Sequence, residues 1–166
     1  MPARYESRVT EGNNDYRFVA SLHARHPSLD PDEITAALKQ EPRTIRRRGE
    51  RRRSPDGALL TGYYDDNYWS IDLKIVAGHD VSEFLHNLIY AQMPHATEFT
   101  RRIDDTGGSV SVFIGVFADG FCDFEIPAAT LRLLGEAGVS VRLDYYGADN
   151  DRARESAEPP DAADSR

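Results

Sequence analysis

The chain has 166 residues, 40% of them hydrophobic and 29% charged, which is enough for one domain with a substantial core. Its net charge of -8 argues against a general nucleic-acid binder, because neutralising phosphates supplies most of the affinity of such proteins. No window approaches the roughly 18 consecutive apolar residues of a membrane helix, and the N-terminus lacks the apolar stretch of a signal peptide. We therefore expect a cytoplasmic protein without membrane contact. Its single cysteine, Cys122, cannot form an internal disulfide.

Both ends of the chain are polar. Residues 1–15 carry no apolar periodicity, and we expect a flexible leader. Residues 147–166 contain no apolar side chain larger than alanine, so we expect a disordered acidic tail. The sequence thus predicts a single α+β domain over residues 16–146.

The first predicted elements are a strand and a helix. Residues 16–24 alternate apolar and polar side chains, the two-residue period of a strand with one face in the core. Asp30 then stands as a helix N-cap with Pro31 at the first helical position, and Pro42 ends the predicted helix. From residue 44 to 53 only Ile45 is apolar enough to bury, which predicts an edge strand or an exposed loop.

The central predicted strand covers residues 68–76. Trp69, Ile71, Leu73 and Ile75 share one face of it, which predicts that Trp69 lies in the core. A second helix is expected from Asp80 to Pro94, with apolar side chains at helical spacing.

Three elements are predicted in the last third of the chain. Residues 109–118 are apolar on both faces, which favours a central strand. Residues 127–138 predict a third helix with Leu131 and Leu134 facing inward, and residues 139–146 predict a closing strand. The order indicates a ferredoxin-like βαββαβ core with an added C-terminal helix and strand, its helices on one face of a mixed or antiparallel sheet. A three-layer α/β arrangement is the alternative.

The chain resembles the family called domain of unknown function 4279 over about residues 16–146. The resemblance rests on a first stretch of "dpdeIT..L...Pt....kGe" type, a strand with a tryptophan, and a last strand that ends in aspartate and tyrosine. The matching residues are Asp30, Pro31, Glu33, Ile34, Thr35, Leu38, Pro42, Thr44, Gly49, Glu50, Trp69, Leu131, Asp144 and Tyr145. The resemblance implies a fold and no activity.

Seven arginines stand within residues 43–53, against one acid, Glu50. Guanidinium groups pair bidentately with oxyanions, so this run is a candidate site for phosphate, nucleic acid or an acidic protein surface. The alternative is a solvated edge strand whose charges discourage sheet-to-sheet aggregation. The seven are Arg43, Arg46, Arg47, Arg48, Arg51, Arg52 and Arg53.

An aromatic and acidic cluster covers residues 63–69. Aromatic side chains beside carboxylates are typical of a recognition surface. The alternative interpretation is a loop that leads into a strand. Its acids fit no calcium-binding loop. His23 and His26 lack two further ligands of the zinc-binding type, so we expect no metal site and no cofactor.

No recognisable catalytic motif is present, and whether the protein is an enzyme stays open. The leading hypothesis is a protein-interaction or regulatory module, of the kind that neutralises another protein. Its partner would be a protein rather than nucleic acid, and its oligomeric state is open. The candidate binding residues are Arg43, Arg46, Arg47, Arg48, Tyr63, Tyr64, Asp65 and Asp66. The alternative is a small-ligand-binding or enzymatic domain with a pocket between the sheet and residues 44–68.

Overall fold

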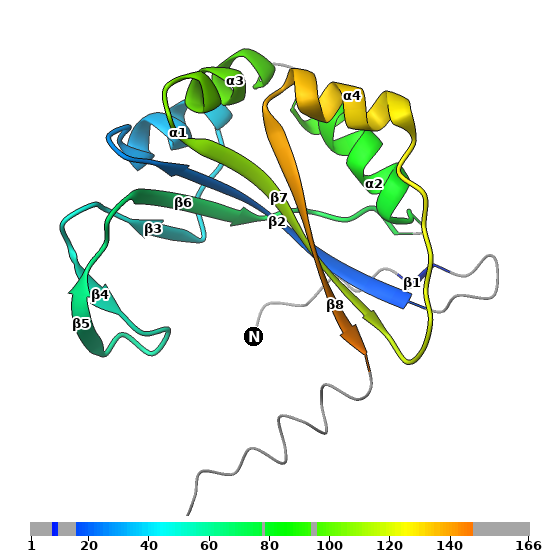
Figure 1. Ribbon diagram of the computed structural model, residues 1–166, viewed down its shortest axis with the longest axis horizontal. Coiled ribbons are helices and arrows are strands. Elements are labelled where there is room, and N and C mark those ends of the chain that lie inside the picture. The colour runs from blue at the N-terminus through cyan, green and yellow to red at the C-terminus, as the bar shows by residue number, and fades with distance from the viewer. Residues whose placement is uncertain (1–7, 10–15, 78, 94–95, 148–166) are drawn as a thin grey trace, which may run out of the picture.

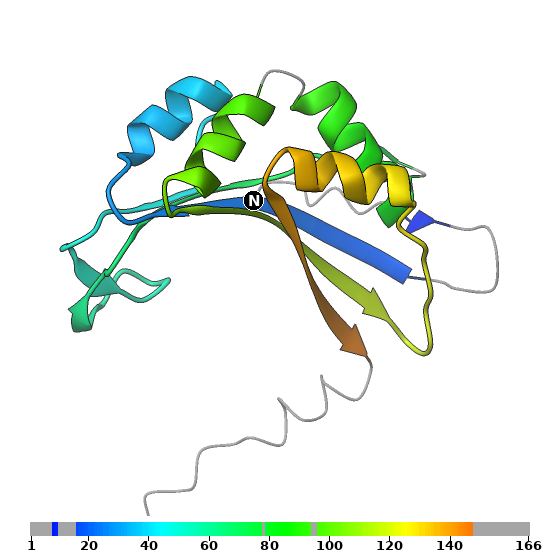
Figure 2. The ribbon, with the colours of Figure 1, turned by 45° about the horizontal axis from the view of Figure 1, so that its top comes forward.

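A curved mixed sheet lies at the centre of the computed structural model, and the helices cover one of its faces (Figures 1 and 2). The structure describes residues 8–9, 16–77, 79–93 and 96–147. The strands are β1 (Arg8–Val9), β2 (Tyr16–His26), β3 (Thr44–Arg46), β4 (Arg51–Arg53), β5 (Leu59–Tyr63), β6 (Asn67–Asp72), β7 (Ser109–Ala118) and β8 (Val139–Gly147). The helices are α1 (Pro31–Leu38), α2 (Val81–Asn87), α3 (Thr97–Asp105) and α4 (Ala128–Glu136), with a π-helical turn η1 (Leu88–Gln92) after α2.

The strand order in the main sheet is β3-β6-β2-β7-β8, and β1 pairs with the start of β2. β2 runs antiparallel to both β6 and β7, β3 runs antiparallel to β6, and only β7 and β8 are parallel. Consequently β2 and β3 run in the same direction with β6 between them, and β6 and β7 do so with β2 between them. The predicted α+β class, mixed sheet and one-sided helix layer are confirmed.

A second sheet, of two strands, projects from the edge of the main sheet. β4 and β5 pair antiparallel, with Arg51 opposite Tyr63 and Arg53 opposite Leu59, and form a hairpin that projects beside β3 (Figure 1). The prediction of an edge strand is confirmed for β3. The sequence did not predict β5, because all five of its residues are exposed and the burial alternation of a strand is missing.

The core lies between the sheet and the helices. Its largest fully buried side chains include Trp69, Phe18, Phe84 and Ile34. Trp69 is 0% exposed, and its indole Nε1 donates a hydrogen bond of 3.0 Å to Thr35 Oγ1 on α1. The prediction that Trp69 is a core residue is therefore confirmed.

One inward-facing assignment on α4 is wrong. Leu134 is buried as predicted, but Leu131 is 50% exposed. The two residues are three positions apart, and on this short helix the buried stripe runs through Thr130 and Leu134, which leaves Leu131 at the solvent side.

The predicted helix starts are confirmed by cap geometry. The Asp30 carboxylate accepts from the Asp32 N–H at 2.9 Å, and Asp80 and Glu83 form a reciprocal capping box. α1 stops before Pro42, because Lys39 takes the left-handed conformation and its N–H bonds to the Thr35 carbonyl.

The two predicted terminal segments fall largely outside the described residues. Of the leader, Arg8 and Val9 pair with Arg17 and Tyr16 of β2. Gly147, taken as the first residue of the tail, is the last residue of β8, and residues 148–166 are not described. Within the described part of the chain, no helix is long and apolar enough to cross a membrane.

Candidate binding cleft on the open sheet face

The face of the sheet opposite the helices, here called the open face, carries the candidate site. On β2, Leu22 and Ala24 are buried under the helices, so Ser21, His23 and Arg25 point to the open face. The strand register sets their neighbours: Arg25 lies opposite Tyr68 of β6, and Tyr68 lies opposite Arg46 of β3. Three strands from separate parts of the sequence thus build one row of side chains.

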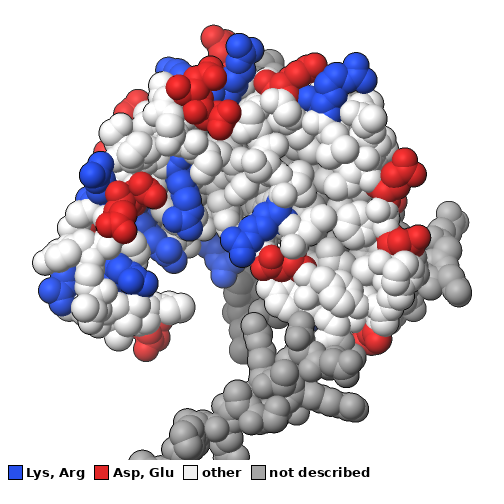
Figure 3. Space-filling model, in the orientation of Figure 1, with Lys and Arg blue, Asp and Glu red and all other residues white. Residues whose placement is uncertain are grey.

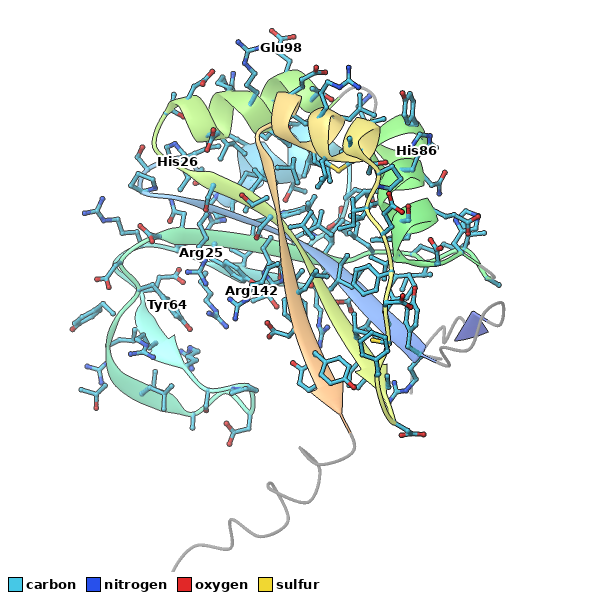
Figure 4. The ribbon with its side chains drawn as sticks, turned by 45° about the vertical axis from the view of Figure 1, so that its right-hand side comes forward. Arg25, His26, Tyr64, His86, Glu98 and Arg142 are labelled. Atoms are coloured by element: carbon cyan, nitrogen blue, oxygen red, sulfur yellow. The ribbon has the colours of Figure 1, made fainter. Side chains whose placement is uncertain are left out.

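A cleft of about 880 Å³ lies where the β4–β5 hairpin stands beside this row. Its walls are residues of β2, β3 and β6, Arg43 just before β3, and the hairpin residues Glu50, Arg51, Arg53, Ser54 and Pro55 with Tyr64. Figure 3 shows the hollow between the hairpin and the body, with several arginine or lysine side chains around it. In Figure 4, Arg25, Tyr64 and Arg142 come from three different elements and extend into the space below the sheet.

Two arginines, Arg46 of the cleft wall and Arg25 beside the cleft, share the ring of Tyr68, which lines it. The guanidinium carbons of Arg25 and Arg46 lie 4.9 and 5.0 Å from the centroid of the Tyr68 ring, and Arg46 also lies 5.4 Å from the Tyr64 ring. Neither arginine forms an ion pair with a carboxylate among the described residues. Cation–π contacts hold the guanidinium planes in position and leave their N–H donors available to a ligand.

His23 lies at the floor of the cleft. Its Nε2 is 2.8 Å from Ser21 Oγ, its ring stacks on Phe113 of β7, and the Tyr68 ring meets it edge-on. Burial lowers the pKa of His23, and the positive charges of Arg25 and Arg142 lower it further, against a weaker opposing effect of Asp72. The Arg25 and Arg142 guanidinium groups thus contribute a positive potential at the imidazole, in addition to the effect of burial.

Two other arginines at or near the cleft contact a carboxylate. Arg43 holds both carboxylate oxygens of Asp72, at 2.7 and 2.9 Å. Arg142 on β8 lies 5.9 Å from the Phe113 ring, and its Nε is 3.5 Å from the Asp144 carboxylate. The 3.5 Å contact is long for a charge-assisted hydrogen bond, so Arg142 keeps most of its donor capacity.

The structure brings three of the eight sequence-predicted site residues to this cleft: Arg43, Arg46 and Tyr64. The Tyr64 hydroxyl bonds to the Arg53 backbone, at 3.1 Å from its N–H, and fixes the ring at the base of the hairpin.

Arg47 and Arg48 point away from the cleft. Arg47 binds Asp30 at 2.5 Å and Asp32 at 2.9 Å and so ties β3 to the N-terminus of α1. Arg48 donates to the Pro27 carbonyl at 3.1 Å. Both guanidinium groups therefore serve the structure.

The other predicted residues lie on the outside of the hairpin. Tyr63 is 57% exposed, under Arg51 at 5.7 Å, and Asp65 and Asp66 are exposed at the turn into β6. None of the three lines the cleft.

The sequence analysis missed Arg25, His23 and Arg142 as site residues. Each occupies a polar position of an alternating strand, which reads locally as an ordinary solvated face. Only the strand order, which places β2 beside β6 and β7 in the middle of the sheet, brings them together. The available signal was the alternation itself, since it predicts which side of each strand they occupy.

Ser21 Oγ and His23 Nε2 are close enough to act as a nucleophile and its general base, but their surroundings differ from those in the active site of a hydrolase. In such sites a carboxylate orients the other ring nitrogen of the histidine. Here the nearby Asp72 carboxylate is held by Arg43. Ser21 also lies within the β2–β7 and β2–β6 ladders, where backbone N–H groups bond to neighbouring strands. This arrangement suits the binding of an anion more than acyl transfer. Among the described residues, no three potential metal ligands gather in one place.

The family model "Domain of unknown function (DUF4279)" matches residues 14–148 of the chain. This confirms the resemblance found in the sequence. No curated protein and no solved structure is detectably similar to the chain.

Proposed function

We propose that this chain, which belongs to the DUF4279 family, is a binding module whose open-face cleft receives an acidic segment of a protein partner. The observation that carries the proposal is the pair Arg25 and Arg46, which share the Tyr68 ring and have no carboxylate partner among the described residues. A role in neutralising or regulating that partner, in the cytoplasm, is part of the proposal.

The charge of the cleft favours an anionic ligand although the whole chain is acidic. Arg25 and Arg142 act on His23, and Arg46 contacts the Tyr68 ring that packs against it, while the carboxylate of Asp72 is already neutralised by Arg43. Guanidinium groups beside low-dielectric aromatic walls attract carboxylates more strongly than freely solvated lysines do. A local positive cleft on a net negative body also directs an acidic partner to this one face.

The hairpin favours a macromolecular ligand over a small one. Leu59, Leu60 and Tyr63 on it are 58%, 40% and 57% exposed, so the hairpin beside the cleft presents apolar side chains to solvent. Clustered exposed apolar and aromatic residues beside charged anchors are typical of protein interfaces. A bound segment would place its carboxylates on the arginines and its apolar side chains on the hairpin.

The experiment uses a fluorescein-labelled glutamate decapeptide and the full chain, with fluorescence anisotropy at low and high salt. We expect Arg25→Ala and Arg46→Ala each to weaken binding about tenfold, because each removes one charge-assisted hydrogen-bonding group. Arg132→Ala is the matched control, since Arg132 is an exposed arginine on α4, on the helix side of the sheet. Equal affinities for the wild type and the Arg25→Ala/Arg46→Ala variant would refute the site.

A test of the protein partner places a photo-cross-linking amino acid at Tyr63, outside the cleft wall but on the hairpin. The proposal expects a discrete adduct from native cells that disappears in the Arg46→Ala background and persists in Arg132→Ala. An adduct indifferent to Arg46→Ala would show that the hairpin binds without the cleft.

A small anionic ligand is the second candidate, favoured by His23 at the floor of a concave site. Arg25, Arg46, Arg142, Asp72 and Tyr68 surround the imidazole from the neighbouring strands, and a bound anion would oppose the lowering of its pKa. Binding would then take up a proton, so affinity would rise as the pH falls towards the lowered pKa of His23. Calorimetry with inorganic phosphate and pyrophosphate tests this candidate, and His23→Gln should remove the part of the pH dependence that comes from the imidazole while leaving the part that comes from ionisation of the phosphate. Tight phosphate binding without peptide binding would favour it over the protein partner.

For the fold we propose a ferredoxin-like βαββαβ core of β2, α1, β3, β6, the α2–α3 region and β7, extended by α4 and β8. It is supported by the two pairs of codirectional strands, each with one strand between them. An experimental structure with a different strand order would overturn it.

A further inference from the structure

The last strand, β8, forms one edge of the main sheet and pairs only with β7 (Figures 1 and 2). It is nine residues long, and its register with β7 runs without a shift from Val139 to Gly147. Among the described residues, none pairs with its outer side. A long edge strand without proline or bulge is a template for another strand, which natural proteins usually block.

The side chains of β8 are also exposed on both faces of the sheet. Leu143 and Tyr145, on the side of the helices but beyond α4, are 45% and 50% exposed. Arg142 and Asp144 lie on the open face, with side chains 70% and 36% exposed. The edge thus offers an apolar strip on one side and two opposite charges on the other.

We propose that β8 pairs antiparallel with β8 of a second copy of this chain, so that two sheets join into one continuous sheet with two-fold symmetry. A two-fold axis perpendicular to the sheet keeps each side chain on its own face. Full overlap of Val139–Gly147 with its copy places the axis at Leu143, the middle residue of the strand.

The register with most overlap is also the one that satisfies the charges. With the axis at Leu143, Arg142 of each chain faces Asp144 of the other, which gives two reciprocal ion pairs on the open face. On the other face Leu143 meets its own copy, flanked by Val141 opposite Tyr145. Opposite charges and apolar pairs directly across strands stabilise a sheet.

The neighbouring registers are disfavoured by the same residues. Moving the axis by one residue places Arg142 opposite Arg142, or Asp144 opposite Asp144, and like charges directly across strands destabilise pairing. The sequence of β8 therefore selects a single register for its own copy. One strand pair is a small interface, so we expect a dimer with a dissociation constant on the order of micromolar.

The first experiment is analytical ultracentrifugation of the full chain over a range of concentrations. We expect a concentration-dependent dimer in the wild type, and monomers for Arg142→Asp and for Asp144→Arg, each of which opposes like charges. An equimolar mixture of these two variants should dimerise again, because each chain supplies the charges that the other lacks. Arg132→Asp on α4 controls for the change in net charge and should dimerise like the wild type.

The second experiment tests the register and does not depend on charge. Leu143→Cys should form a disulfide-linked dimer under mild oxidation, because directly opposed residues of an antiparallel pair lie within disulfide reach. Ser140→Cys is the matched control, since Ser140 faces Tyr146 of the other chain and not its own copy. Wild type shows the background from Cys122, which is half-buried.

The outcomes separate cleanly. A wild type that stays monomeric at millimolar concentration overturns the proposal, as does a dimer that both charge reversals leave intact. Equal cross-linking of Leu143→Cys and Ser140→Cys would show that no fixed register exists. Circular dichroism of each variant establishes that it is folded, and recovery of the dimer in the mixture excludes misfolding as the cause of the monomers.

Discussion

Replacing Trp69 tests the packing between α1 and the sheet most directly. Its side chain is 0% exposed, and Ala24 of β2 and Ile45 of β3 lie opposite it on the two neighbouring strands. Trp69→Ala removes the largest side chain of the core and leaves a cavity, which typically costs about 3 to 5 kcal/mol. A domain of this size has a free energy of unfolding of about 5 to 15 kcal/mol, so a large share of the stability would be lost.

Part of that cost belongs to the hydrogen bond between Trp69 and Thr35. Thr35 Oγ1 accepts from the indole at 3.0 Å and donates to the Pro31 carbonyl at 3.1 Å, so one hydroxyl links the strand to the first turn of α1. Thr35→Val would leave the buried indole N–H without an acceptor, which costs about 1 to 3 kcal/mol. In a Trp69→Phe background, Thr35→Val should lower the free energy of unfolding by less, because no indole N–H remains to lose its acceptor.

The assay is chemical denaturation followed by far-ultraviolet circular dichroism, which does not depend on tryptophan. In the wild type, Trp69 is the only tryptophan, and its emission should be blue-shifted and resistant to quenchers. A folded Trp69→Ala protein within about 1 kcal/mol of wild type would refute the core assignment. Additive effects of Thr35→Val and Trp69→Phe would refute the role of the hydrogen bond.

Three further predictions concern the backbone and the helix caps. Gly108→Ala should destabilise strongly, because its new methyl group would lie 2.6 Å from a backbone oxygen and from the His26 ring; thermal denaturation measures the loss. Lys39→Gly should raise the free energy of unfolding by up to about 1 kcal/mol, because Lys39 has a φ of 53°; an unchanged or lower value would contradict this. The pKa of Asp30 is lowered by the Asp32 N–H and by Arg47, so its charge stabilises the fold above pH 4 or so and this is lost as the pH falls through the lowered pKa. Asp30→Asn keeps the cap acceptor, and its melting temperature should lie below that of wild type at neutral pH and converge with it in acid.

Local chemistry was sufficient to predict most elements. The start of α1 follows from Asp30 and Pro31, and that of α2 from the Asp80 and Glu83 capping box, because these side chains bond to backbone groups two or three residues away. The alternation along residues 16–24 predicted the buried face of β2 correctly over that range. These contacts join residues that are close together in the sequence, so they can be predicted from the sequence alone.

The predictions that failed concern features that depend on residues distant in the sequence. The exposed β5 is a strand only because β4 lies beside it, and α2 and α3 separate within a stretch whose apolar spacing resembles one extended helical region. Leu131 is exposed because the buried stripe of α4 runs through Thr130 and Leu134. None of these outcomes has a signal within a few residues of the position concerned.

The sequence by itself determined that the fold is of the α+β class, where α1 and α2 begin, which faces of its strands are buried, and that arginines gather near residue 46. Tertiary structure decided which of those arginines face the open-face cleft. Arg47 and Arg48 turned to the α1 side, while Arg46 met Arg25 across the Tyr68 ring, from β2, about twenty residues earlier in the chain. The physical reason is that a strand fixes only the side on which each side chain lies. Its neighbours are set by which strands pair and in which register, and these depend on burying the whole core at once.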